Sequence, residues 1–141
     1  MNHNGYMLIA DDEEHLVKID QENAMMYVYW KRHIEGELFK DKFKGLLKII
    51  GRFRPVRWLG NAQATHYTTV QDARWFLNHF LPQLVDSSIS RYARVETRNS
   101  LMLLDSLNLQ EKLANLSNGH PENFEFRYFT EEPQAFEWLR S

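Results

Sequence analysis

The side chains best suited to chemistry gather in one polar segment, residues 63–69. This segment places an imidazole among hydroxyl groups, in the order Thr65, His66, Tyr67, Thr68 and Thr69. A histidine beside hydroxyls has the components of a base and a nucleophile, because imidazole exchanges protons near neutral pH. Solvated loop histidines are far more common than catalytic ones, so an enzyme would require a polar pocket around His66.

Other patterns that carry known chemistries are absent from the sequence. The chain contains no cysteine, which excludes disulfides, thiolate zinc sites and cysteine nucleophiles. Its six histidines show neither the H-E-x-x-H pattern nor pairs spaced four apart. Gly51 and Gly60 are isolated, so no glycine-rich phosphate loop is present, and there is no G-x-S-x-G motif. We therefore expect no metal, no cofactor and no enzymatic activity.

The residues after this polar segment carry the start signal of a helix. Thr69 is expected as the N-cap, with Asp72 three residues later near the positive helix end. Pro82 lacks an amide donor, so we expect the helix to kink or end around Leu81. Trp75 and His79 lie beside the apolar stripe of this helix, which consists of Ala73, Phe76, Leu77, Phe80 and Leu84.

Strand-like segments alternate with amphipathic helical segments along the rest of the chain. Asn23, which tolerates a positive φ, is expected in the turn of the first hairpin. Thr130 is expected to cap the last helix. Strands are predicted at residues 15–20, 24–30, 56–61, 91–97 and 124–129, with a weaker candidate at 6–10. The other helices are predicted at residues 35–53, 99–116 and 131–140.

The order β-β-α-β-α-β-α-β-α predicts an α/β fold. We expect a mostly parallel sheet of four to five strands with an N-terminal antiparallel hairpin. The length of 141 residues predicts a single domain over residues 1–141, and the hydrophobic content of 43% suffices for a core. No apolar stretch approaches the roughly 20 residues of a membrane span, and no signal peptide is visible, so we expect a cytoplasmic protein.

Two groups of side chains have both an ordinary and a functional interpretation. The basic stretch at residues 40–57 is typical of a solvated helix face, with an anionic-ligand or nucleic-acid site as the alternative. The net charge of -2 favours the solvated face. Aromatic residues at helical spacing predict a core, with an apolar ligand pocket as the alternative. The aromatic residues expected to converge are Phe39, Phe43, Trp58, Trp75, Phe76 and Phe80.

Polar and apolar residues alternate in the last two predicted strands. This alternation predicts a sheet face with little cover, which carries cross-strand ion pairs. The functional alternative is a partner surface built on Arg57, Arg94, Glu125 and Arg127.

Five segments between residues 15 and 139 occur in a recognisable order. They are HLVKIDQENAMMYVYW, ELFKDKFKGLLKII, RWLGNA followed by TTVQDARWF, RYARVET, and FEFRYFTEEPQAFEWL. In this order the chain resembles the SpoIIAA-like or STAS domains, and more closely their uncharacterised bacterial STAS/CRAL-TRIO-like branch. Antagonists of that family carry a phosphorylated Ser or Thr in an Asp-Ser-Ser-Gly turn before a helix. The resemblance implies Thr68 and Thr69 as phospho-acceptor candidates, although the Asp and the Gly of that turn are missing here.

These observations together predict a non-enzymatic regulatory or binding module of STAS-like fold. We expect it to bind a protein partner or a small apolar ligand near residues 63–80. Nucleic acid is disfavoured as a partner, and a homodimer formed through an exposed aromatic edge such as Phe129 is a further alternative. The candidate contact residues are Thr65, His66, Tyr67, Thr68, Thr69, Trp75, Trp58 and Phe39.

Overall fold

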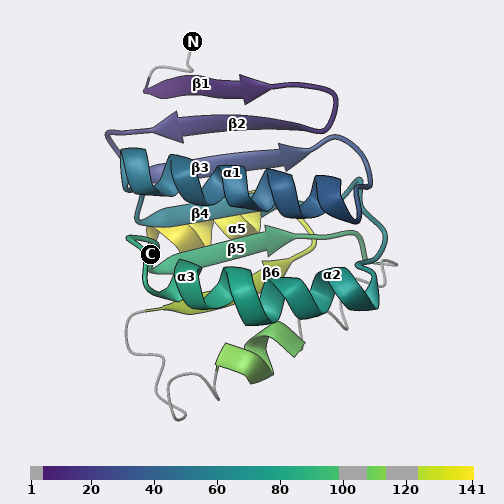
Figure 1. Ribbon diagram of the computed structural model, residues 1–141. Coiled ribbons are helices and arrows are strands. Elements are labelled where there is room, and N and C mark those ends of the chain that lie inside the picture. Colours follow the sequence, from purple (N-terminus) through teal and green to yellow (C-terminus); the bar gives the residue numbers. More distant parts are fainter. Residues whose placement is uncertain (1–4, 99–107, 114–123) are drawn as a thin grey trace.

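Six strands form one mixed sheet whose spatial order follows the sequence (Figure 1). The computed structural model describes residues 5–98, 108–113 and 124–141. The first three strands are antiparallel neighbours, whereas the third to the sixth run parallel to one another. The strands are β1 (Tyr6–Asp11), β2 (His15–Asp20), β3 (Met25–Trp30), β4 (Arg57–Asn61), β5 (Arg91–Val95) and β6 (Glu125–Phe129).

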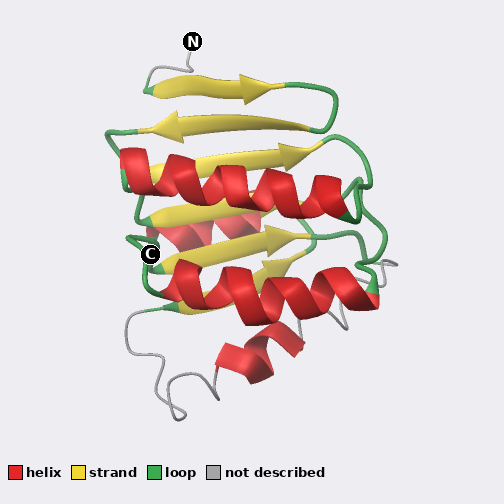
Figure 2. Ribbon diagram, in the orientation of Figure 1, coloured by secondary structure: helices red, strands yellow, loops and turns green. Residues whose placement is uncertain are grey.

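Helices cover the two faces of the sheet unequally (Figure 2). On one face lie α1 (Glu37–Phe53) and a second helix in three parts: α2 (Val70–Trp75), the π turn η1 (Phe76–Phe80) and α3 (Leu81–Val85). On the other face α5 (Glu132–Arg140) packs against β4, β5 and β6. Residues 108–113 are also helical. None of the described helices combines the length and hydropathy that crossing a lipid bilayer requires.

The sheet separates a large core from a small one. The large core lies under α1 and α2–α3 and includes Trp58 and Phe80, both fully buried. The small core joins Leu59 of β4 to Leu139 of α5. Because α5 does not reach the first strands, Leu8 on that face is 58% exposed. Burial of the apolar helix faces is therefore concentrated on one side of the sheet.

The predicted α/β arrangement is confirmed, but the strand count and some element ends are wrong. The weak candidate at residues 6–10 does form a strand, so the sheet has six strands rather than four to five. The positive φ of the hairpin turn falls on Ala24, at 52°, and not on Asn23. The last helix starts one residue later than predicted, with Glu131 and not Thr130 at its N-cap position. The helix predicted at residues 99–116 lies mostly outside the described residues.

Of the two outcomes predicted for Leu81, a kink or an end of the helix, the end is wrong, because the helix continues past Pro82. The amide of Leu81 donates to the carbonyl of Phe76, five residues earlier, which is the hydrogen bond of a π turn. This wider turn just before the proline relieves the clash between the proline ring and the preceding turn. The helix therefore continues to Val85, and Phe80 and Leu84 stay buried.

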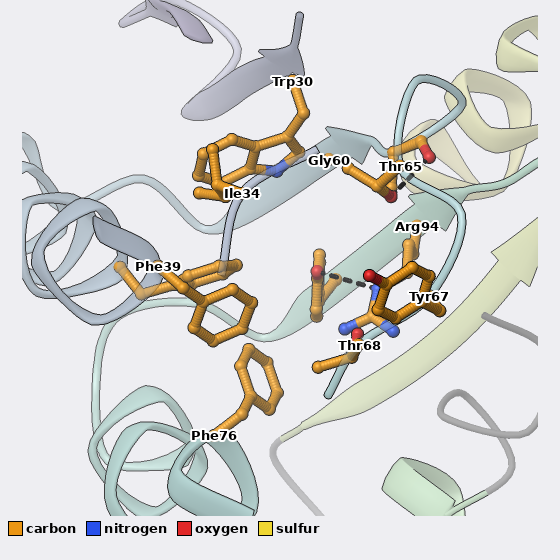
Figure 3. A pocket seen from close by; sticks show the side chains of 12 residues that line it. Trp30, Ile34, Phe39, Gly60, Thr65, Tyr67, Thr68, Phe76 and Arg94 are labelled. Atoms are coloured by element: carbon orange, nitrogen blue, oxygen red, sulfur yellow. Dashed lines mark hydrogen bonds between the residues drawn. The ribbon is translucent and has the colours of Figure 1, made fainter. Parts of the chain in front are cut away.

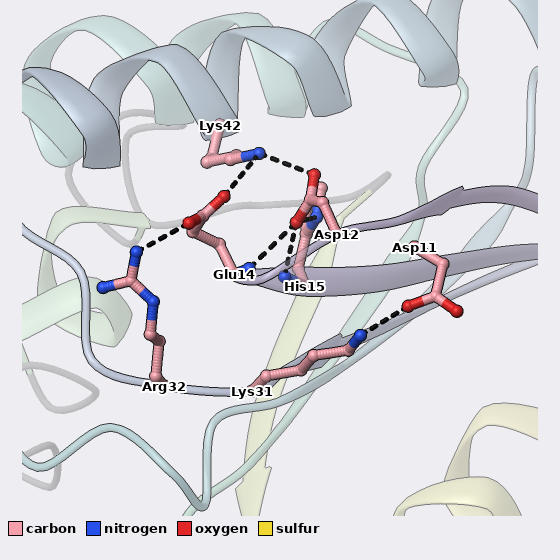
Figure 4. Close-up of polar contacts among 7 residues, drawn as sticks. All are labelled: Asp11, Asp12, Glu14, His15, Lys31, Arg32 and Lys42. Carbon is pink, nitrogen blue, oxygen red and sulfur yellow. Dashed lines mark hydrogen bonds and ion pairs between the residues drawn. The ribbon is translucent and has the colours of Figure 1, made fainter.

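The turn between β1 and β2 is tied to α1 by acidic side chains (Figure 4). Asp12 accepts hydrogen bonds from the amides of Glu14 and His15 and from Lys42 Nζ at 2.7 Å. Burial opposes ionisation of Asp12, but the bonds from Lys42 and from these amides outweigh it and hold its pKa well below the usual value. Glu14 pairs with Lys42 and with Arg32. The edge hairpin is thus fastened to the helix that covers the sheet.

The low pKa of Asp12 predicts a pH-dependent contribution to stability. An acid with a lowered folded-state pKa stabilises the fold above its unfolded pKa of about 4 and loses this contribution as the pH falls. We expect Asp12→Asn to lower the free energy of unfolding at pH 7 by about 1 kcal/mol, because half-exposed ion pairs contribute little. Urea unfolding should show the difference shrinking below pH 4. Glu13→Gln, at an exposed position of the same turn, should show no such difference, and equal effects of both variants would contradict the role of Asp12.

Candidate functional site

An apolar pocket opens where β3, β4 and β5 end and where α1 and α2 begin (Figure 3). Its cavity volume is about 40 Å³, several times the roughly 10–15 Å³ that one water molecule needs. Crevices outside the carboxyl ends of parallel strands are frequent ligand sites in open α/β sheets. The pocket is lined by Trp30, Ile34, Phe39, Phe43, Gly60, Ala62, Thr65, Tyr67, Thr68, Phe76, Tyr92 and Arg94.

Aromatic rings form the wall of this pocket. The ring of Phe43 lies at 5.1 Å from Trp30, 4.6 Å from Phe39 and 5.4 Å from Phe76, measured between ring centroids. The ring of Trp75 packs edge-on against Phe39, with a distance of 6.1 Å between the ring centroids. The predicted convergence of aromatic residues is therefore confirmed. Most of these rings belong to the core, and three of the six predicted rings, Phe39, Phe43 and Phe76, also face the cavity.

The floor of the pocket is built around Gly60 of β4. The rings of Trp58 and Tyr92 stack beneath it at 3.9 Å, on neighbouring strands. Trp58 is fully buried, and its indole Nε1 has no hydrogen-bond partner. A buried donor without an acceptor costs free energy, so an explanation for it is needed.

Arg94 supplies the charge of the pocket. The residue is only 4% exposed, and its Nε donates to the Tyr92 hydroxyl oxygen at 3.2 Å. The guanidinium lies within 5.7 Å of the rings of Phe76, Tyr92 and Phe126, and 4.0 Å from a carboxylate oxygen of Glu96. The partner surface considered as an alternative, built on Arg57, Arg94, Glu125 and Arg127, is therefore wrong in its placement of Arg94. Arg94 lines the pocket on the face that α1 and α2 cover, whereas Arg57 donates to the carbonyl of Leu139 in α5 on the opposite face.

The rim of the pocket joins two loops. His33, in the loop between β3 and α1, packs on Tyr67 with ring centroids 4.5 Å apart. Glu35 accepts hydrogen bonds from Tyr67 and lies 2.7 Å from His33 Nε2. The bonds to His33 and Tyr67 lower the pKa of Glu35. Tyr67 is nevertheless 44% exposed, so the rim is in contact with solvent.

Asp72 fixes the two helix starts next to the pocket. Its amide donates to the Thr69 hydroxyl oxygen at 3.1 Å, which confirms Thr69 as the N-cap. Asp72 is only 1% exposed, and its carboxylate accepts a hydrogen bond from the amide of Gly36 at 2.9 Å. Gly36 precedes α1 and has a φ of 72°, a conformation that favours glycine. One buried carboxylate thus holds the first turns of α1 and α2 together, and both ends carry the positive dipole that favours an anion.

A second polar network holds the other end of the loop that follows β4. Asn61 and Tyr27 both donate to Glu132 at the start of α5. Burial, and after it the bond to Glu132, raises the pKa of Tyr27. The side-chain Nε2 of Gln63 donates to the backbone carbonyl of Thr130, and the backbone amide of Gln63 donates to the side-chain oxygen of Asn61. The start of this loop is therefore bound to residues 130–132, and its later residues line the pocket.

The structure divides the predicted site residues into two groups. Thr65, Tyr67, Thr68 and Phe39 line the pocket. His66 is exposed and does not line the pocket, and Thr69 serves as the N-cap. Trp58 lies under the floor, and Trp75 packs behind Phe39. Within the described ranges, no three His, Asp or Glu side chains come together in a way that could hold a metal ion.

The sequence patterns did not indicate six of the lining residues, which are Trp30, Ile34, Gly60, Ala62, Tyr92 and Arg94. A signal was available for Gly60, because an isolated glycine within a strand often marks a close approach. For Arg94 the alternation of polar and apolar residues in β5 suggested solvent exposure instead. All residues from Tyr92 to Glu96 are buried, which that pattern could not show.

Comparisons with known proteins support the fold. No protein-family model and no curated protein matches the sequence. Among solved structures, an uncharacterised protein of the DUF3478 family with a SpoIIAA-like fold, from Shewanella loihica PV-4, aligns with a TM-score of 0.52 at 13% identity. The alignment covers 95% of this chain and 91% of that one. The fold is SpoIIAA-like. At this identity the likeness concerns the fold alone, so the function of this SpoIIAA-like chain has to be argued from its pocket.

The shared role of Asp72 predicts a measurable loss of stability when its carboxylate is removed. We expect Asp72→Ala to lower the free energy of unfolding by about 1 to 2 kcal/mol, because the Gly36 amide loses its acceptor. Urea unfolding at pH 7 measures the change. Asp41→Ala, at an exposed position of α1, is the matched control and should change stability by less than about 0.5 kcal/mol. An effect of Asp72→Ala no larger than that of the control would contradict the role of Asp72.

Proposed function

We propose that this chain is a non-enzymatic binding module that holds a small, mostly apolar ligand in the pocket at the ends of β3, β4 and β5. The observation that carries the proposal is the cavity walled by aromatic rings and closed at its floor by Gly60. Ligand sites in proteins are typically concave and apolar, with few polar groups that fix orientation. The polar groups here belong to Thr65, Thr68, Tyr67 and Arg94.

The positions of the reactive side chains favour binding over catalysis. His66 is exposed and lies outside the pocket lining, so it is not surrounded by the polar pocket that a base would require. The hydroxyl of Thr65 donates to the carbonyl of Ala62 at 2.8 Å, within its own loop. The hydroxyl oxygen of Thr69 accepts the capping bond. These side chains thus have structural roles in the described residues.

A protein partner is the second candidate, and a separate observation favours it. Val70, the first residue of α2, is 69% exposed, and Tyr67, in the loop just before α2, is 44% exposed. Adjacent exposed apolar groups are a common feature of protein contact surfaces. Such a partner would bind over the mouth of the pocket and not inside it.

The basic stretch at residues 40–57 gives less support to an anionic or nucleic-acid ligand. Lys42 pairs with Asp12 and Glu14, and Arg57 faces the side of the sheet that α5 covers. Lys44 and Lys48 remain exposed on α1, where lysines are typical of a solvated helix face. The stretch therefore does not form one continuous surface.

Filling the pocket should abolish binding of a small apolar probe. We expect 2-phenylethanol to shift the amide resonances of pocket-lining residues in ¹H–¹⁵N spectra of the wild type. Ala62→Leu places a larger side chain in the pocket and should reduce these shifts at least fivefold, whereas Ala64→Leu in the same loop should retain them. Circular dichroism checks that both variants are folded. Unchanged shifts in Ala62→Leu, or no localised shifts in the wild type, would refute the pocket as the binding site.

The partner candidate responds to a different substitution. Val70→Asp changes the exposed surface and leaves the pocket lining intact. If the biological ligand is a protein, Val70→Asp should weaken its binding and Ala62→Leu should not. The opposite pattern supports the small-molecule pocket.

A further inference from the structure

We infer that the ligand of this pocket is a small organic acid, whose carboxylate occupies the space above Gly60 and whose apolar part lies against the aromatic wall. The inference rests on the proposed function and adds the chemical class of the ligand. Three features of the floor lead to it: an open space, a buried donor without an acceptor, and a positive charge.

The open space results from the missing side chain of Gly60. A Cβ atom at this position would lie 3.4 Å from Tyr92 Cε1, 3.5 Å from Trp58 Nε1 and 3.6 Å from the Tyr92 hydroxyl oxygen. These are ordinary contact distances, so a methyl group on Gly60 would fit without displacing its neighbours. In the native chain this face of Gly60 is bare, and a ligand atom can pack against its Cα there. An oxygen atom of a ligand in this space would lie near two polar groups of the floor.

The buried donor is the indole N–H of Trp58. It has no hydrogen-bond partner, although the side chain is fully buried. An indole nitrogen can only donate, so its partner has to be an acceptor. A ligand oxygen above Gly60 would supply this acceptor and remove the cost of the unsatisfied donor.

The positive charge comes from Arg94. It is the only Asp, Glu, Lys or Arg residue among the described residues that line the pocket, and it lies on β5, which pairs with β4 at the floor. Its Nε donates to Tyr92, and its Nη1 pairs at 4.0 Å with Glu96, which does not line the pocket. A guanidinium is a fork of donors that binds carboxylates well, and hydrogen bonds between charged groups are about twice as strong as neutral ones. The floor therefore favours an anionic acceptor over a neutral one.

The cavity volume limits which part of the acid is enclosed. About 40 Å³ corresponds to roughly three water-sized groups, which is the size of a carboxylate, and Phe39, Phe43 and Phe76 supply the apolar contacts for the carbon atoms next to it. The remainder of a larger ligand would extend past Tyr67, which is 44% exposed at the rim. Phenylacetate has this composition, with a carboxylate, one methylene group and a ring.

The test compares phenylacetate with 2-phenylethanol, which has the same ring and number of chain carbons but a neutral CH₂OH group in place of the carboxylate. Titration of each probe into the full chain, followed in ¹H–¹⁵N spectra, should show phenylacetate binding about tenfold more tightly. The indole N–H resonance of Trp58, assigned with Trp58→Phe, should move on addition of phenylacetate as its hydrogen bond forms. Equal affinity for the two probes, or a Trp58 indole resonance that does not move, would overturn the inference.

Gly60→Ala provides a variant that closes the space with a single methyl group. Its contacts of 3.4–3.6 Å allow the fold to persist, which a thermal unfolding curve verifies. We expect at least a tenfold loss of phenylacetate affinity. Gly45→Ala in α1, where an added Cβ meets nothing within 4 Å, is the matched control and should bind like the wild type. Full affinity in a folded Gly60→Ala protein would also overturn the inference.

The outcomes separate this inference from the proposed function. If both probes bind the wild type with the same affinity and Ala62→Leu abolishes the binding of both, the apolar pocket is supported. The inference that the ligand is an organic acid is then overturned. If neither probe binds to the wild type, the proposed function fails together with the inference.

Discussion

The hydrogen bond between the buried carboxylate of Asp72 and the amide of Gly36 is the contact on which the site depends. It joins the starts of two helices that approach the sheet from separate crossovers. The distance between these helix starts sets the separation of Phe39 on α1 and Phe76 on the second helix, and thereby the width of the pocket. Without this contact, the positive ends of both helices would lack a shared negative partner.

The remaining features of the pocket follow from the order of the strands. Parallel pairing of β3, β4 and β5 brings Trp30, Gly60 and Arg94 to the same end of the sheet. The helices above contribute apolar rings, whereas the floor contributes donors. An apolar wall excludes water and so strengthens any charge interaction inside. A cavity with donors at its floor and rings at its sides suits an amphipathic ligand with one anionic end.

The parts of this structure that local patterns determine could be predicted from the sequence. The cap at Thr69 and the apolar stripe that follows it depend on neighbours three or four residues apart, so periodicity and capping rules identify them. The convergence of Phe39, Phe43 and Phe76 followed from the same periodicity. The general α/β order also followed, although β1 was only a weak candidate, and in the structure it is an edge strand on which Leu8 is exposed.

The floor of the pocket could not be predicted, because it depends on contacts between distant strands. Arg94 occurs in a sequence that alternates as a half-solvated strand does, yet helices cover both faces of β5. The role of Gly60 depends on Tyr92, which is brought beside it only by the register between β4 and β5. The length of the helix beyond Pro82 likewise depended on a π turn that no local rule specifies.

A crystal structure of the chain grown in the presence of phenylacetate tests the central claim most directly. We predict electron density for the acid in the pocket, with one carboxylate oxygen above Gly60 and within hydrogen-bond distance of Trp58 Nε1. The Gly36–Asp72 hydrogen bond should be present in the same structure. An empty pocket at a phenylacetate concentration that saturates the protein in solution, or the acid bound elsewhere, would contradict it.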